Sequence, residues 1–323
     1  MSVLLANDYV KEEFMMRDIY CETLLDIAKK DERIVTLDAD LMNSIGMKAF
    51  QKEFPDRTIN CGVQEANMIG VAAGLSATGK VPFAHSFGPF ATRRCYDQIF
   101  ISAAYAKLNV RIVGSDPGIT AAYNGGTHMP FEDMGILRNI PSITLIEPVD
   151  SAMLKNILQQ IVNLYGVYYI RLMRKNAIRI YEDGSAFEIG KAVKIREGKD
   201  LTIISSGVLV AESIEAAKKL EAKGISAGIL NMFTWKPIDK QAVIECAKTT
   251  GAVLTAENHN IYNGLGSAVA EVLGENIPVP LERVGCLDKF GEVGLENDLK
   301  VIFKMTADDI VKKAVKLLAR KKA

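Results

Sequence analysis

The sequence predicts an α/β fold with two doubly wound domains, each a mostly parallel sheet covered by helices on both faces. Short β-branched runs alternate with helical patterns along most of the chain, and this alternation is typical of parallel sheets. The length of 323 residues exceeds what one hydrophobic core usually serves. A charged, turn-rich stretch at 175–200 interrupts the alternation, so we place the domain boundary near residue 185, giving domains 1–185 and 186–323.

In the first domain we expect strands that end in polar residues, joined by amphipathic helices. The expected strands are 33–41, 109–116, 142–148 and 167–174, and the expected helices lie in 14–31, 59–80 and 150–163. The carboxyl ends of parallel strands meet at one edge of a sheet. Active groups should therefore gather in the loops that follow these strands.

The stretch 175–200 is expected to be a linker with a short hairpin, and the second domain repeats the strand–helix alternation. Its expected strands are 201–207, 225–232, 252–258 and 280–285, and its expected helices are 208–224, a helix from Lys240, 266–276 and 307–322. The motif NGLGSAV (263–269) has only two of the three glycines of a dinucleotide-binding loop. We interpret it as the turn that enters a helix.

Composition excludes several classes of function. Lys+Arg and Asp+Glu both number 39, and a net charge of zero argues against binding to nucleic acids or anionic membranes. The N-terminus lacks the pattern of a signal peptide, and no apolar stretch is long enough for a transmembrane helix. Five scattered cysteines indicate reduced thiols and a cytoplasmic location, and three scattered histidines predict no protein-ligated metal.

One carboxylate stands out in the segment INCGVQEANMIGVAAGLSATGK (59–80). Glu65 precedes a helical face built from small residues, namely Ala66, Gly70, Ala73, Gly74 and Ala77. The residues alone allow two interpretations. Glu65 is either an acid favoured by the dipole in the first turn of a helix, or a catalytic carboxylate presented where a strand gives way to a helix. The small residues along this face let another backbone approach closely.

Two further segments carry residues suited to binding. In YNGGTHMPFED (123–133), two glycines precede His128, which projects from a loop at the carboxyl side of a strand. This histidine serves either the backbone of its own loop or a ligand. In HSFGPFATRRCYDQIF (85–100), Phe87 and Phe90 are either core residues or the walls of a site for a flat heteroaromatic ring.

Taken together, these segments resemble the transketolase family. The segment with Glu65, the pair Phe87 and Phe90, GGTHMP and MRKN (173–176) occur in the order and spacing of that family, and ENHNIYNGLGSAVAEVL resembles its C-terminal domain. The resemblance covers the pyrimidine-binding domain and the C-terminal domain, essentially the whole chain. The family's GDG and downstream Asn, which hold the pyrophosphate of thiamin diphosphate and its Mg²⁺, are absent.

The resemblance implies thiamin diphosphate as cofactor. Glu65 would hydrogen-bond N1′ of its aminopyrimidine and thereby promote loss of the proton at C2 of the thiazolium ring. Phe87 and Phe90 would pack against the aminopyrimidine, and His128 would point at a substrate oxygen near C2.

The resemblance also implies a substrate site and two departures from the family. Arg174 and Arg17 would bind a sugar phosphate. Asn124 stands where the family has an aspartate that binds a sugar hydroxyl, and Ser115 replaces a histidine. A third ring-contacting aromatic is here Arg93. These changes leave the donor and acceptor sugars open.

The resemblance implies the C-terminal subunit of a split transketolase that moves a two-carbon ketol unit between sugar phosphates. Its partner would be an N-terminal subunit with the GDG…N motif, which would hold the pyrophosphate and Mg²⁺. This chain would also pair with itself, most simply as α2β2. The small face that follows Glu65 would then pack closely at a subunit interface. Three alternatives stay open: the beta subunit of a 2-oxo-acid dehydrogenase, a 1-deoxyxylulose-5-phosphate synthase-like enzyme, and a catalytically inactive assembly partner. A nicotinamide enzyme is a more distant one.

Overall fold

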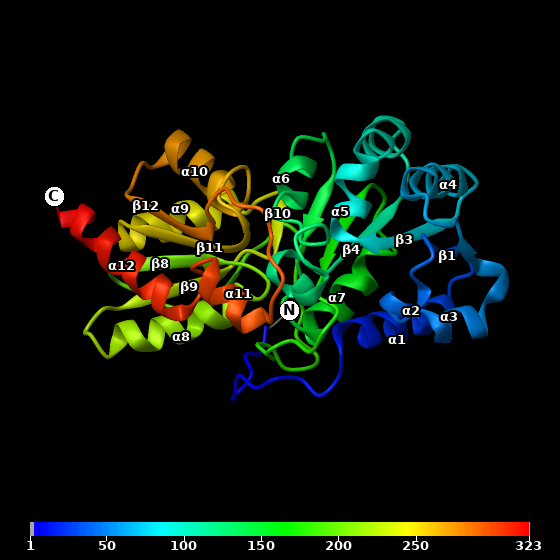
Figure 1. The fold of residues 1–323 in the computed structure, drawn as a ribbon. Coiled ribbons are helices and arrows are strands. Elements are labelled where there is room, and N and C mark those ends of the chain that lie inside the picture. Colours follow the sequence, from blue (N-terminus) through cyan, green and yellow to red (C-terminus); the bar gives the residue numbers. More distant parts are fainter. Residues whose placement is uncertain (1–2, 323) are drawn as a thin grey trace.

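The computed structural model describes residues 3–322 and shows two α/β lobes lying side by side (Figure 1). The first lobe contains a seven-stranded sheet in the order β10-β5-β6-β4-β3-β1-β2. Its strands are β1 (Ile34–Asp38), β2 (Thr58–Asn60), β3 (Val81–Phe87), β4 (Arg111–Ser115), β5 (Thr144–Ile146), β6 (Tyr168–Leu172) and β10 (Thr234–Lys236). All neighbours are parallel except β10, which runs antiparallel to β5.

The second lobe contains a five-stranded sheet in the order β12-β11-β8-β9-β7. Its strands are β7 (Val193–Arg196), β8 (Leu201–Ser205), β9 (Ala227–Asn231), β11 (Val253–Asn260) and β12 (Leu281–Cys286). Only β7 runs antiparallel to its neighbour. The central strands are buried along their whole length, as expected for a parallel sheet covered on both faces.

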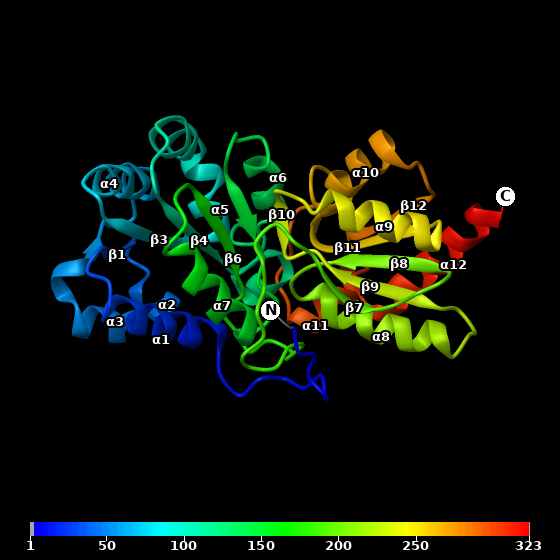
Figure 2. The same ribbon diagram turned by 180° about the vertical axis from the view of Figure 1, so that it is seen from behind.

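Helices cover both faces of each sheet, as seen from front and back in Figures 1 and 2. The α-helices are α1 (Met16–Ala28), α2 (Met42–Ile45), α3 (Lys48–Glu53), α4 (Glu65–Ala77), α5 (Gly88–Ala91), α6 (Asp133–Leu137), α7 (Ser151–Ile161), α8 (Leu209–Glu221), α9 (Lys240–Thr250), α10 (Leu265–Asn276), α11 (Glu296–Ile302) and α12 (Ala307–Lys322). Short 3₁₀-helices η1 (Pro55–Arg57), η2 (Arg93–Cys95) and η4 (Gly118–Asn124) and the π-helix η3 (Gln98–Tyr105) complete the set.

Two apolar layers sandwich the sheets. One layer joins α1 and α7 of the first lobe to α8 and α12 of the second, and the other joins α4 and η3 to α9 and α10. Each layer therefore runs through both lobes, and the two sheets share a continuous core.

The predicted fold class is confirmed, and the expected long helices and strands are present at the expected places. The prediction of a hairpin in 175–200 is wrong. Ile178 and Tyr181 instead form antiparallel bridges with Lys11 and Leu5 near the N-terminus, and β7 pairs with β9. Strand β10 was also not expected from the sequence, because it is three residues long and follows β9 closely.

The glycine-rich turn before α10 is a helix entry, as the sequence predicts. The buried carboxylate of Glu257 accepts hydrogen bonds from the backbone N–H groups of Leu265 (2.7 Å) and Gly266 (2.8 Å) at the start of α10. Burial raises the pKa of Glu257 to about 8. Since the protein's own carboxyl group occupies the helix N-terminus, no room is left there for a dinucleotide pyrophosphate.

A buried guanidinium lies where the two lobes meet. Arg171 in β6 donates to Asp133 (2.9 Å) and Glu147 (2.7 Å), and also to the carbonyl oxygens of Pro130 (3.1 Å) and Asn258 (2.9 Å). Neither Arg171 nor Asp133 is accessible to solvent. Burial by itself would raise the pKa of Asp133. The guanidinium of Arg171 has the larger combined effect and holds the pKa of that carboxyl below its usual value.

The same network reaches the second lobe through Glu147. Its other oxygen accepts a hydrogen bond from Ser206 Oγ (2.5 Å), which in turn accepts one from the indole N–H of Trp235 (3.0 Å). The network therefore links β6, the end of β5 and the start of α6 to the loop after β8 and to β10.

We predict that Arg171→Met destabilises the chain strongly. The change leaves Asp133 and Glu147 buried without their cation, which typically costs about 3–5 kcal/mol. The matched control is Arg33→Met, which removes an equal charge from an exposed ion pair with Asp31 and should cost about 1 kcal/mol or less. Urea unfolding followed by circular dichroism measures both, and equal losses in the two variants would contradict the role given to Arg171.

Candidate functional site

The side chains predicted to form the site emerge at the carboxyl edge of the first sheet. Glu65 begins α4 after β2, Phe87 closes β3, His128 lies in the loop after β4, and Arg174 follows β6. These strands are parallel and close together in the sheet, so their carboxyl ends bring together residues that are far apart in sequence.

Glu65 is a buried carboxylate with a defined set of partners. Its side chain is only 2% exposed. Oε1 accepts a hydrogen bond from Ser86 Oγ (3.3 Å), and Oε2 pairs with the guanidinium of Arg94 (2.7 Å). The residue therefore lies in the first turn of α4, as predicted, and has a specific cationic partner that the sequence did not indicate.

Three aromatic rings meet next to this carboxylate. His128 lies edge-to-face against Phe87, with ring centroids 5.2 Å apart, and against Phe90, at 5.0 Å. Phe87 and Phe90 are themselves 6.2 Å apart. The guanidinium carbon of Arg94 lies 4.0 Å from the ring centroid of Phe90, so Arg94 links the aromatic cluster to Glu65.

A cationic end of the site adjoins the aromatic cluster. The guanidinium of Arg174 lies 5.0 Å from the ring centroid of Phe87 and pairs with the buried Asp116 through two contacts of 2.6 and 2.8 Å. Burial raises the pKa of Asp116, and the guanidinium opposes this shift. Arg17 and Arg174 both donate to the backbone carbonyl oxygen of Ser44, at 3.1 and 3.0 Å.

Asn124 is the outermost of the predicted residues. It is exposed and makes a long contact of 3.5 Å to Asp116. The predicted side chains are thus connected from Glu65 through the aromatic rings to the two arginines and Asn124, with Arg94, Asp116 and the carbonyl oxygen of Ser44 as intermediates. Their roles in binding and catalysis remain predictions.

The second lobe supports the loop that carries His128. A Cβ atom on Gly126 would collide with the carbonyl oxygen of Gly291, and one on Gly125 would lie 2.7 Å from Val293. Asn258 of β11 fixes the same region, because it accepts from the N–H of Ile119 (3.0 Å) and donates to the carbonyl oxygen of Pro117 (2.8 Å). The glycines are therefore needed for close approach of the two lobes.

Sequence reasoning missed Arg94, Ser86 and Ser44 as members of the site. Arg94 lies four residues after Phe90, which is a helical spacing. It follows Arg93, however, and nothing in the sequence tells which arginine turns inward. Arg93 pairs instead with Glu132 (2.6 Å). Ser44 contributes a backbone oxygen, which no side-chain pattern reveals.

The small-residue face of α4 is partly open in this chain. Gly70, Gly74 and Ala77 are exposed, and a Cβ atom on either glycine would meet nothing within 4 Å. Ala73 is buried. The face is thus not covered by its own lobe, so it stays available for the predicted interface.

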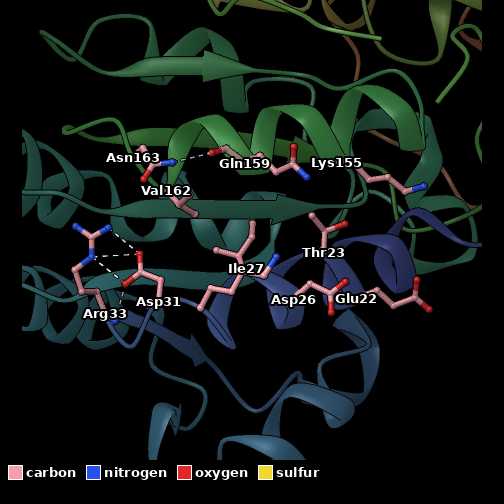
Figure 3. Close-up of a pocket in the computed structure, with 11 residues that line it drawn as sticks. Glu22, Thr23, Asp26, Ile27, Asp31, Arg33, Lys155, Gln159, Val162 and Asn163 are labelled. Atoms are coloured by element: carbon pink, nitrogen blue, oxygen red, sulfur yellow. Dashed lines mark hydrogen bonds and ion pairs between the residues drawn. The ribbon is translucent and has the colours of Figure 1, made fainter. Parts of the chain in front are cut away.

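A cavity of about 970 Å³ lies elsewhere, between α1 and α7 (Figure 3). Its walls carry charged and amide side chains such as Glu22, Lys155 and Asn163, and Arg33 is held there by Asp31. None of the predicted site residues lines it. Within residues 3–322, no group of three or more His, Cys, Asp and Glu residues is arranged to hold a metal ion, and no helix is long and apolar enough to cross a membrane.

Comparison with known proteins gives consistent matches along the chain. Residues 12–178 match the family model of the transketolase pyrimidine-binding domain, and residues 190–310 match that of the transketolase C-terminal domain. A "6-deoxy-6-sulfo-D-fructose transketolase subunit" from Clostridium sp. (strain MSTE9) is 55% identical over 96% of each chain. Transketolase from Rattus norvegicus is 33% identical over 98% of this chain, which spans 51% of that protein.

A solved structure matches the fold over nearly the whole chain. The structure titled "Split gene transketolase, inactive beta4 tetramer" superimposes with a TM-score of 0.89 and 40% sequence identity, covering 95% of this chain and 99% of that one. The match therefore includes both lobes and their arrangement.

We predict opposite effects for two glycine substitutions. Gly126→Ala forces the His128 loop away from Gly291 and should cost about 1–3 kcal/mol in the free energy of unfolding, as overpacking usually does. Gly70→Ala adds a methyl group in open space on a helix and should stabilise the isolated chain by about 0.5–1 kcal/mol. Denaturant unfolding of both variants measures the free energy of unfolding. An unchanged value for Gly126→Ala would show that Gly126 and Gly291 are not in tight contact.

Proposed function

Because this chain belongs to the transketolase family, we propose that it is the C-terminal subunit of a two-subunit, thiamin-diphosphate-dependent transketolase. The proposal fits the relatives that match it end to end, one of which is named as a transketolase subunit and another as a split-gene transketolase. The observation that carries the proposal is the contact between a buried carboxylate and an aromatic cluster, which joins Glu65 to Phe90 and His128 through Arg94.

The residues of this cluster fit the aminopyrimidine half of the cofactor. Glu65 is a buried carboxyl group at a helix N-terminus, and Phe90 offers an aromatic face beside it. When bound, thiamin diphosphate supplies a nucleophilic carbon that takes up the two-carbon unit. Glu65 would hold a proton at N1′ of the ring, Phe87 and Phe90 would orient the ring, and His128 would hydrogen-bond the substrate oxygen at the reacting carbon.

The partner of this chain would be an N-terminal subunit that holds the pyrophosphate and Mg²⁺ through a GDG…N motif. Support comes from the sequence, which has no GDG, and from the end-to-end matches to relatives named as a transketolase subunit and a split-gene transketolase. The open face of α4, with Gly70 and Gly74 exposed, is a suitable surface for the assembly. We propose an α2β2 heterotetramer, domains divided near residue 185, and a cytoplasmic location.

The substrate would be a sugar with an anionic end group. Arg17 and Arg174 present two guanidinium groups at the outer end of the site, and guanidinium groups bind tetrahedral anions with paired hydrogen bonds. Asp116 offsets part of this positive charge. A phosphate and a sulfonate both meet this requirement, and the relative from Clostridium is named for a sulfo-sugar.

We predict that Glu65→Gln lowers kcat of the reconstituted complex by roughly 10²- to 10⁴-fold, because positioned proton transfer typically contributes that much. The control Glu53→Gln, at the exposed end of α3, should behave as the wild type. The assay follows ketol transfer with each subunit alone and with both together, and activity should need both.

Two outcomes would favour the alternatives. Full activity of Glu65→Gln in the complex would favour a catalytically inactive assembly partner. Decarboxylation of pyruvate or branched-chain 2-oxo acids would favour a 2-oxo-acid dehydrogenase or a 1-deoxyxylulose-5-phosphate synthase-like enzyme.

We predict that Arg174→Met raises KM for the anionic sugar by about tenfold or more, because a hydrogen bond to a charged group contributes about 1.5–3 kcal/mol. The control Lys175→Met removes the same charge from the next, exposed residue and should change KM little. Measuring KM in parallel for 6-phosphorylated and 6-sulfonated ketoses identifies the end group. An unchanged KM for both sugars in Arg174→Met would contradict the assigned anion site.

A further inference from the structure

One contact in the site is at odds with the proposed role of its members. Arg94 Nη1 lies 2.7 Å from Glu65 Oε2, and its guanidinium carbon lies 4.0 Å from the ring centroid of Phe90. The two groups that would receive the aminopyrimidine are thus already in contact with a side chain of the same protein.

A guanidinium and an aminopyrimidine make similar demands on a binding site. Both are flat and both stack on an aromatic face. A guanidinium donates N–H groups to a carboxylate, and N1′ of the aminopyrimidine shares a proton with one. Ser86 already donates to Oε1 of Glu65, which leaves Oε2 as the oxygen open to a further partner. Arg94 pairs with that oxygen and also covers the face of Phe90. The aminopyrimidine ring and the Arg94 guanidinium would therefore compete for the same place.

The surroundings of Arg94 allow its side chain to move away from Glu65 and Phe90. Its side chain is 44% exposed, whereas that of Glu65 is 2% exposed. Its one hydrogen bond within the described residues is the bond to Glu65. The backbone of the short helix η2 is held separately, by the thiol of Cys95 on the carbonyl oxygen of Phe90 (3.3 Å). Rotation of the side chain into solvent therefore requires no change in the backbone.

We infer that Arg94 is an internal stand-in for the aminopyrimidine: its side chain contacts Glu65 and Phe90 in the cofactor-free subunit and swings into solvent when the cofactor enters. The inference rests on the proposed function. In the cofactor-free subunit Arg94 gives the buried carboxylate of Glu65 a cationic partner, without which its buried charge would be costly. It also lowers the apparent affinity for the cofactor, because only the fraction of molecules with Arg94 displaced can bind it.

The test compares Arg94→Met with wild type in the complex of this chain with its N-terminal subunit. Calorimetric titration with thiamin diphosphate and Mg²⁺ gives the Kd, and the steady-state assay gives kcat at saturating cofactor. Methionine keeps an unbranched apolar stem and removes the competitor, so we expect a Kd lower by about threefold to tenfold. The control Arg33→Met removes the same charge from an exposed pair with Asp31 and should leave the Kd unchanged.

Two results would overturn the inference. The first is a Kd for Arg94→Met equal to or higher than that of wild type, since a residue that only orients Glu65 would weaken binding when removed. The second is a crystal structure of the cofactor-bound complex in which Arg94 still contacts both Glu65 and Phe90. Failure of the wild-type complex to bind thiamin diphosphate at all would instead overturn the proposed function, and this inference with it.

Discussion

The arrangement of the molecule depends on the ion pairs of one buried arginine. Arg171 has no access to solvent, and it satisfies Asp133, Glu147 and two backbone carbonyl oxygens at once. One of these oxygens, that of Pro130, belongs to the loop that carries His128, and the other, that of Asn258, belongs to the second lobe. A single guanidinium thus sets the position of the second lobe relative to the loop that closes the aromatic cluster. Ordinary apolar packing would not fix this position so closely, because it has no preferred direction.

Much of the fold and part of the site could be predicted from the sequence. The long helices and buried strands follow from periodicity, and Glu65, Phe87, Phe90 and His128 do meet at the carboxyl edge of the sheet. That edge is determined by topology, because parallel neighbours must present their carboxyl ends together. Chain order and strand polarity predict that edge, and the resemblance to the transketolase family pointed to these particular residues on it.

The remaining features depend on contacts between segments far apart in sequence. Arg94 and Arg93 are indistinguishable as sequence, and only the packing of η2 decides that one reaches Glu65 while the other reaches Glu132. Ser44 acts through a backbone oxygen. The stretch 175–200 was predicted to form a hairpin because its turn residues can be recognised in the sequence. Its actual partners are the segment around Leu5 and strand β9, and no local pattern in the sequence identifies them.

Strand β10 bears on how this chain can be divided. It comes from the C-terminal half, yet it forms the edge of the first sheet beside β5. The N–H of Glu147 also donates to the carbonyl oxygen of Phe233 just before β10 (2.8 Å), and Lys236 donates to the carbonyl oxygens of Arg138 and Ile140. A fragment cut between the lobes would leave β5 as an open edge strand, which invites pairing with other molecules. The two lobes are thus one unit for expression and for recombination with other proteins, although each has its own sheet.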